Sequence, residues 1–295
     1  MMNAAEKRTR SFPVHRFMAA LVAVAVTLSA AVSVHLNTYV SHAFSADTGP
    51  VIVSHRGGGN AGPENTVAGL RAAQEAGAIA CEVDVQRTAD GAYVINHDAT
   101  FERVAGVDRR VDEMTLEEIR ELNVDGERVP TLQELLGAAG RSMILLIELK
   151  GDTADAQMAD DVVAMIREYG VEDRCILISF LGEVIDYIAE AYPWMPTCYL
   201  TFAYDEDAAQ RDCDYVGVKR TNVTQEVIDQ AHDQGHRILV WTVNEEEEQR
   251  TFIEQGADGI ITDEVAQAMQ LTGGTDSGTF STLLQLLRAT VEQTA

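Results

Sequence analysis

The sequence is poor in basic residues, with 22 Lys and Arg against 47 Asp and Glu in 295 residues and a formal net charge of −25. Because nucleic-acid binding requires a basic face that displaces counterions from phosphates, this shortage argues against a nucleic-acid partner. Hydrophobic residues make up 46% and charged residues 23% of the chain, as in ordinary globular proteins. The length then allows one domain of about 220–250 residues with terminal segments, or two small domains.

Cysteine is also scarce. The four cysteines are too few for a disulfide framework, and no CxxC or Cys/His spacing indicates zinc. In an oxidising compartment, a Cys198–Cys213 disulfide and buried free thiols are the two alternatives. No GxGxxG pattern follows the first expected strand, which disfavours a dinucleotide-binding fold.

The N-terminus has the layout of a targeting or anchoring segment. Residues 1–16 carry four basic side chains (Lys7, Arg8, Arg10 and Arg16), and an uncharged run then extends from Phe17 to Val34. Its length falls between the apolar region of a signal peptide and a spanning helix of about 20 residues. We therefore predict a basic segment at 1–16, a transmembrane anchor or signal region at 17–36 and a linker at 37–49.

Two fates of this segment remain open, retention as an anchor and cleavage as a signal. Ala43-Phe44-Ser45 offers only a mediocre small-x-small cleavage site. A buried soluble helix is disfavoured because the basic residues precede the run, as the positive-inside rule requires of an exported chain. Both fates predict an extracytoplasmic protein, anchored in the cell membrane or secreted. Its exported part, without residues 1–46, has a net charge of 18 − 46 = −28.

From residue 51 onward, short β-branched runs alternate with helical patterns. The expected strands are 51–54, 78–85, 143–149, 175–180, 197–202, 215–218, 237–243 and 259–262. The expected helices include 66–76, 132–139, 154–169, 183–191, 225–234 and 245–255. Eight such alternations predict an α/β protein with a (β/α)8 TIM barrel at 50–271, and a doubly wound open sheet is the weaker alternative. Residues 272–295 are predicted to form a linker and a C-terminal helix.

A small insertion interrupts the alternation after the second strand. The Asp90-Gly91 pair between two strand-like runs predicts a hairpin. If the turn is centred at Ala89/Asp90 or at Asp90/Gly91, the numbers of the residues that pair across the hairpin sum to 179 or 181. His97 then lies opposite Glu82 or Asp84. Residues 99–129 then form an excursion that we expect over the C-terminal mouth of the barrel, where loops build active sites.

Three carboxylates lie inside predicted strands. Because side chains alternate along a strand, Glu82, Asp84 and Glu148 share the lumen side near the mouth, while their neighbours face the helices. Three carboxylates crowded in a low-dielectric pocket repel one another unless a cation neutralises them. Oxygen ligands suit Ca²⁺ or Mg²⁺, so we predict one divalent cation here. The alternative is a structural ion-pair cluster with Lys150 and Arg56.

Two histidines fall at the same mouth. His55 ends the first strand, and the hairpin returns His97 toward the second. Imidazoles titrate near neutrality, so one can accept a proton while the other donates one. Arg56, Gly57–Gly59 and Lys150 add positive charge and bare backbone that suit an anion such as a phosphodiester.

The helix start near residue 66 leaves two roles open. Asn65 or Thr66 can cap the helix, whereas Glu64 can reach the mouth and bind the metal or a substrate hydroxyl.

These motifs resemble the glycerophosphodiester phosphodiesterase family, in particular its small bacterial members. The resemblance covers about residues 51–269 in the family's order: SHRGG, PENT, EVDVQRTADGAYVINHD, VPTLQELL, LLIELKG, ISF, ILVWTVN and GADGIITD. It implies a metal-dependent barrel that hydrolyses glycerophosphodiesters to sn-glycerol 3-phosphate and an alcohol. The GGGNAG stretch between His55 and Glu64 departs from the family pattern and bears on the shape of the glycerol pocket.

The resemblance also implies roles for individual residues. The implied metal ligands are Glu82, Asp84 and Glu148, the acid/base pair is His55 and His97, and the substrate contacts are Arg56, Lys150 and Trp241. Core packing at a strand end is the alternative for Trp241. Two other functions remain open: a lysophospholipase D acting on membrane lysolipids, and a non-catalytic barrel that binds its ligand. The charge-rich insertion favours soluble diesters over lipids.

Overall fold

The computed structural model describes residues 40, 43–44, 49–140 and 143–272. The basic segment predicted at 1–16, the apolar segment at 17–36, most of the linker at 37–49 and the tail from 273 onward lie outside this part of the chain. Within it, no helix has the length and hydropathy needed to cross a membrane.

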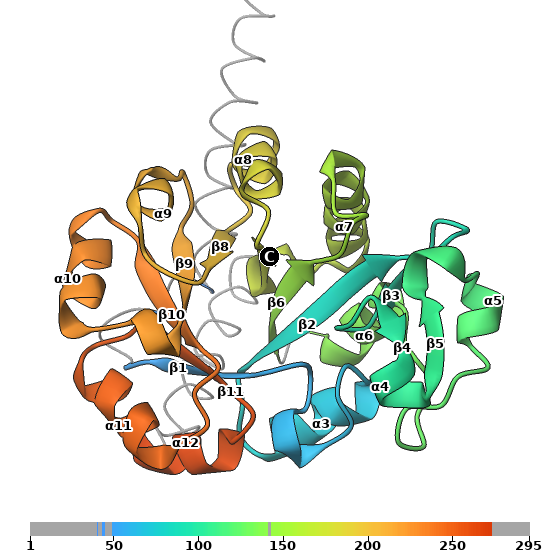
Figure 1. Ribbon diagram of the computed structural model, residues 1–295, viewed down its shortest axis with the longest axis horizontal. Helices are drawn as coiled ribbons and strands as arrows, with labels where there is room; N and C mark the ends of the chain where they lie inside the picture. Colours follow the sequence, from blue (N-terminus) through green and yellow to red (C-terminus); the bar gives the residue numbers. More distant parts are fainter. Residues whose placement is uncertain (1–39, 41–42, 45–48, 141–142, 273–295) are drawn as a thin grey trace, which may run out of the picture.

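Eight parallel strands of the described chain close into a barrel surrounded by helices, which confirms the predicted (β/α)8 fold (Figure 1). Hydrogen bonding runs in the order β1-β11-β10-β9-β8-β7-β6-β2, and β2 pairs with β1 to close the ring. The strands are β1 (Val51–Ser54), β2 (Ala80–Arg87), β6 (Ile144–Leu149), β7 (Cys175–Ser179), β8 (Thr197–Thr201), β9 (Tyr215–Lys219), β10 (Arg237–Trp241) and β11 (Gly259–Thr262).

The helices of the outer layer begin mostly at capping residues. They are α3 (Val67–Glu75), α6 (Leu132–Ala139), α7 (Ala156–Tyr169), α8 (Gly182–Ala191), α9 (Glu206–Gln210), α10 (Gln225–Asp233), α11 (Glu246–Glu254) and α12 (Val265–Leu271). The Asp155 side chain accepts a hydrogen bond from the backbone N–H of Met158, so α7 starts two residues later than predicted. The Thr66 side chain caps α3 in the same way, which settles the capping role in favour of Thr66 over Asn65.

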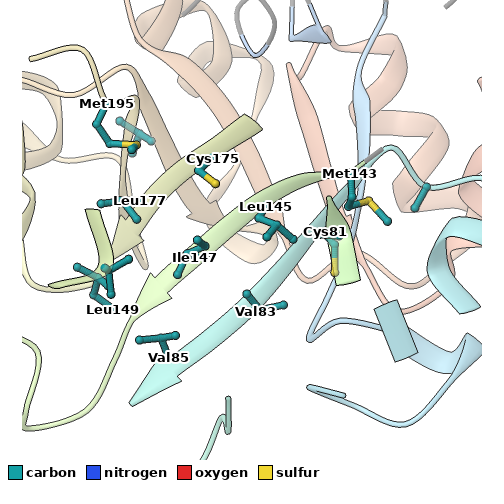
Figure 2. Close-up of a cluster of buried hydrophobic side chains, with 14 of the residues drawn as sticks. Cys81, Val83, Val85, Met143, Leu145, Ile147, Leu149, Cys175, Leu177 and Met195 are labelled. Atoms are coloured by element: carbon teal, nitrogen blue, oxygen red, sulfur yellow. The ribbon is translucent and has the colours of Figure 1, made fainter. Parts of the chain in front are cut away.

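The barrel strands bury both of their faces, and the two faces form separate cores. Figure 2 shows one face, where Val83 and Val85 of β2 lie beside Ile147 and Leu149 of β6, all in the layer that packs against the helices. The alternate positions, such as Leu146, belong to a second apolar cluster inside the barrel. This alternation is the predicted one, and it leaves the carboxylates of β2 and β6 on the lumen side.

The predicted hairpin register is wrong by one. Strand β3 (Tyr93–Ile95) pairs with β2 so that Arg87 faces Tyr93 and Val85 faces Ile95, and the residue numbers sum to 180. The turn is a three-residue loop, closed by the Thr88 N–H that donates to the Ala92 carbonyl, with Gly91 at φ +83°. His97 therefore falls beyond the pairing, level with Val83 rather than with Glu82 or Asp84.

The insertion after β3 is a small subdomain beside the barrel (Figure 1). It consists of β4 (Thr100–Phe101), α4 (Glu102–Ala105), β5 (Val107–Arg110) and α5 (Leu116–Ile119). A third apolar cluster, which includes Phe101 and Ile119, holds it to Val94 of β3. The insertion thus has its own core and presents its first residues to the mouth of the barrel.

Three residues of the predicted linker lie inside the barrel. Val40, Ala43 and Phe44 are buried in the lumen cluster, and the Phe44 ring meets that of Tyr215 edge to face at 5.2 Å between centroids. Tyr215 opens β9, so these contacts lie at the N-terminal end of the strands, which we call the floor.

All four cysteines are free thiols, and three of them are buried. The Cys198–Cys213 disulfide is therefore not formed. Burial raises the pKa of both thiols above the ordinary range.

Candidate active site

The three predicted metal ligands meet at the mouth of the barrel. Asp84 of β2 is the register partner of Glu148 of β6, and Glu82 lies two residues earlier on β2. All three side chains are buried, and they offer oxygens that lie within 4.8 Å of one another. The fold thus brings together the carboxylates that the strand period placed on one face.

This cluster is electrostatically strained. Burial, with the charges of Asp84 and Glu148, raises the pKa of Glu82 well above its ordinary value. Burial and the charge of Asp84 raise the pKa of Glu148 to about 7. Asp84 behaves differently: burial opposes its ionisation, but Lys150, His97 and Asn65 outweigh burial and lower its pKa. The surroundings therefore oppose full ionisation of the three carboxylates.

Lys150 is the cation nearest to the cluster. Its Nζ lies 3.1 Å from Asp84 Oδ1 and 2.9 Å from Glu148 Oε1. One ammonium faces three carboxylates, and among the described residues no group donates a hydrogen bond to Glu82 Oε1. An oxygen-only set in which Glu82 Oε1 is buried without a hydrogen-bond donor fits a hard divalent cation such as Ca²⁺ or Mg²⁺.

His55 is held from behind by a carboxylate. The residue follows the end of β1, and its Nδ1 lies 2.8 Å from Asp263 Oδ1 at the end of the neighbouring β11. Asn244 donates a hydrogen bond from Nδ2 to Asp263 Oδ2 at 2.7 Å and fixes the carboxylate. Burial opposes the ionisation of Asp263, but its bonds to His55 and Asn244 lower its pKa overall. The contact at Nδ1 leaves Nε2 of His55 for a substrate.

His97 is held in a similar way by a different group. Its Nδ1 lies 2.7 Å from Asp98 Oδ1, and Arg103 of the insertion donates from Nε to Asp98 Oδ2 at 2.6 Å. The Gln86 amide of β2 donates to the Asn96 carbonyl and so fixes the loop that carries His97. Burial lowers the pKa of His97, although the charge of Asp84 opposes this shift.

The loop after His55 supports the acidic cluster. The Arg56 backbone N–H donates to Glu82 Oε2 at 2.8 Å, and Arg56 has φ +50°. Asn65 donates from Nδ2 to Asp84 Oδ2 at 2.8 Å, which orients that carboxylate. Glu64 instead accepts two hydrogen bonds from Arg103 and lies 3.6 Å from Arg56. The described structure thus engages Glu64 with arginines rather than with the acidic cluster.

The glycines that follow Arg56 serve close packing. A Cβ at Gly59 would lie 2.6 Å from the Asp263 carbonyl oxygen, and Gly59 has φ +53°. A Cβ at Gly58 would lie 2.8 Å from Gly69 of α3. Bare backbone here lets the loop approach α3 and the residue that holds His55.

The side chains of the mouth enclose a cavity of about 220 Å³. Its charged side contains the two histidines, Arg56, Lys150, Glu82 and Glu148. Its other side contains the apolar residues Ile178, Phe180, Leu200, Phe202, Trp241 and Ile261, together with Thr242. Trp241 lies in this wall, with its ring centroid 5.4 Å from that of Phe180 and 5.8 Å from that of Phe202.

Sequence reasoning missed several residues of this site. Asp263, Asn244, Phe180 and Phe202 were not singled out, although each lies just past the C-terminal end of a strand or within three residues of it. That position alone was the available signal, since in a parallel barrel the strand ends build the site.

Comparison with known proteins matches this arrangement to one family. Residues 55–267 match the model of the glycerophosphoryl diester phosphodiesterase family. The chain belongs to this family. A glycerophosphodiester phosphodiesterase of Caldanaerobacter subterraneus is 31% identical over 229 residues, which cover 72% of this chain and 94% of the relative.

Solved structures of the family share the fold. The glycerophosphodiester phosphodiesterase of Thermotoga maritima is 28% identical with a TM-score of 0.64, covering 75% of this chain and 98% of the relative. An Oleispira antarctica phosphodiesterase, solved in complex with the product sn-glycerol-3-phosphate, is 23% identical with a TM-score of 0.72 over 76% of this chain and 97% of that one. The chain is thus an enzyme of the phosphodiesterase class, and the matched region contains both histidines and all three carboxylates.

Proposed function

We propose that this phosphodiesterase hydrolyses soluble glycerophosphodiesters to sn-glycerol 3-phosphate and an alcohol, using His55 and His97 as the acid/base pair and one Ca²⁺ or Mg²⁺. The observation that carries the proposal is the pairing of two histidines, each fixed at Nδ1 by a carboxylate, on one cavity with the acidic cluster. The product seen in the Oleispira antarctica relative agrees with this substrate class.

The charged side of the cavity suits the phosphodiester. Glu82, Asp84 and Glu148 would hold the cation, which when bound supplies positive charge for the phosphoryl oxygens. Arg56 and Lys150 line the same side and stabilise the negative charge that grows on those oxygens.

The two histidines then move the protons. One histidine accepts the proton of the attacking hydroxyl as the hydroxyl oxygen bonds to phosphorus. The other histidine protonates the oxygen of the leaving alcohol as the bond between that oxygen and phosphorus breaks. The nucleophile is either water or the 2-hydroxyl of the substrate glycerol. The second route gives a cyclic phosphodiester that water opens.

The apolar side of the cavity suits the carbon skeleton of glycerol, with Trp241 as the wall. A lysophospholipase D activity is the second candidate, since Phe202 at this wall is 59% exposed and offers an apolar surface outside the cavity.

The test uses the purified full chain in mild detergent with glycerophosphocholine. Glycerol 3-phosphate and choline phosphate are measured separately, with EDTA and with added Ca²⁺ or Mg²⁺. Metal-dependent release of glycerol 3-phosphate is the expected result. Release of choline phosphate would mean that the other P–O bond breaks, and no turnover of this substrate or of lysophosphatidylcholine would favour a binding barrel.

A further inference from the structure

Residues next to the apolar N-terminal segment are part of the barrel core. Val40, Ala43 and Phe44 are 0%, 3% and 1% exposed, although they precede the first strand. The Phe44 backbone N–H donates to the Val40 carbonyl at 3.1 Å, so the residues form a helical turn. We call these three residues the floor plug.

The floor of the barrel is shaped to receive this plug. Phe44 lies against Tyr215, the first residue of β9, and near Gly259, the first residue of β11. A Cβ at Gly259 would lie 3.2 Å from the Phe44 ring, so glycine leaves room for it. The plug shares its apolar cluster with Val51, Ala80 and residues of the six other barrel strands. It fills the end of the lumen opposite the active site.

The plug ties the floor closely to the apolar segment. Only residues 37–39 separate the end of the predicted anchor at residue 36 from Val40. A chain spans at most about 3.6 Å per residue, so the four residue steps between them cover at most roughly 15 Å. The mouth lies at the other end of the strands, since His55 and Trp241 stand at their C-terminal ends.

The plug also bears on processing. Cleavage after Ala43-Phe44-Ser45 would remove all three plug residues and open the apolar floor to water. The burial of these residues therefore argues against cleavage at this position.

We propose that the chain retains its apolar segment as a membrane anchor, and that the plug holds the floor of the barrel toward the bilayer with the mouth facing the aqueous phase. The enzyme then acts on soluble diesters and not on lipids of its own membrane. The substrate part of this proposal rests on the proposed function, whereas the anchor and the orientation do not.

The anchor is tested on the full chain expressed with export in a bacterial host. Mass spectrometry of the N-terminal peptide, after separation of membranes from soluble protein, is expected to find the segment at 17–36 intact and in the membrane fraction. An N-terminus at Ala46, or any other cleavage within 17–45, would overturn the proposal. Neither result depends on turnover.

The orientation is tested with two single-cysteine variants reconstituted into vesicles that carry acceptor-labelled lipids. Gln234→Cys lies in an exposed turn just before β10 at the floor, and Thr221→Cys lies in an exposed turn just after β9 at the mouth. We expect greater energy transfer from a fluorophore at Gln234→Cys than from one at Thr221→Cys. Equal or reversed transfer would overturn the orientation, and labelling of the unsubstituted chain corrects for the native Cys213.

The substrate consequence is measured in the same vesicles. The vesicle-bound enzyme should turn over glycerophosphocholine in the water as fast as the detergent-solubilised enzyme does. It should not turn over lysophosphatidylcholine held in the same bilayer. Efficient hydrolysis of that lipid would overturn the substrate part. If neither substrate is turned over while the anchor and transfer results hold, the proposed function fails and the orientation stands.

Discussion

The two ends of this barrel are built from the same strands with opposite chemistry. At the floor, first strand residues such as Tyr215 pack on Phe44 in an apolar cluster. At the mouth, Glu82, Asp84 and Glu148 crowd together with too little positive charge around them. Packing at the floor therefore stabilises the fold, whereas the crowded carboxylates at the mouth lower its stability while they hold reactive groups in place. Changes at the two ends should separate rate from stability.

The largest effect on rate is expected at the histidines. His55→Ala and His97→Ala should each lower kcat for glycerophosphodiester hydrolysis by at least about 10²-fold, because each removes a proton-transfer group. Both side chains are partly exposed, so Tm and metal affinity should stay close to the wild type. The measurement is glycerol 3-phosphate release at saturating substrate. Near wild-type turnover in either variant would contradict its assigned role.

The floor should show the reverse behaviour. Phe44→Ala leaves a cavity beside Tyr215 and should lower the free energy of unfolding by about 3–5 kcal/mol, with kcat unchanged at temperatures where the variant stays folded. Phe44→Leu is the matched control and should retain most of the stability. Denaturant unfolding with activity on the same sample measures both quantities. A normal stability in Phe44→Ala would show that the plug adds nothing to the floor.

Metal binding should change how stability depends on pH at the mouth. Without metal, burial and neighbouring charges raise the pKa of Glu148 from its ordinary value of 4.5 to about 7, so the folded state binds more protons than the unfolded one. Stability should therefore fall as pH rises through this window, by up to about 1.4 kcal/mol per pH unit for one such group. A bound cation keeps the carboxylates ionised and should remove this slope.

Tm is measured from about pH 5 to 7.5, the window of the Glu148 pKa shift. One series is taken in EDTA and the other in saturating Ca²⁺ or Mg²⁺. The gain in Tm from the metal should grow with pH. Groups that titrate equally in both series contribute equally to the two Tm curves, so their contributions cancel in the difference between the curves. Parallel curves would mean that the carboxylates do not bind the ion.

The contrast between the ends also explains what the sequence could predict. The period of two along β2 and β6 correctly placed the carboxylates inside the lumen, because that rule is local. The hairpin register depended on whether Gly91 adopts a left-handed conformation in a three-residue loop, which the Asp-Gly pair alone does not decide. Asp263 contacts His55 only because β11 closes against β1, and Phe44 joins the floor through tertiary packing.

A smaller loss is expected when the support of His55 is weakened. Asp263→Asn keeps an oxygen near Nδ1 but removes the charge, and should lower kcat by roughly 10-fold to 100-fold, as for other carboxylates that orient a functional imidazole. The role is one of positioning, so KM should change little while the pH profile of kcat shifts. Asn244→Ala should give a milder form of the same effect. An unchanged pH profile with lower Tm would indicate a purely structural role.

The smallest effect is expected at the rim. Arg103 joins Asp98 behind His97 to Glu64, but its side chain is 45% exposed, and exposed ion pairs contribute about 0–1 kcal/mol. Arg103→Ala should therefore lower kcat only a few-fold. Raising the ionic strength should lower the kcat of the wild type but not that of the variant. Arg109→Ala, which breaks an ion pair with Glu118 elsewhere in the insertion, is the matched control. A loss as large as that of His97→Ala would mean that the insertion, and not the barrel, sets the position of His97.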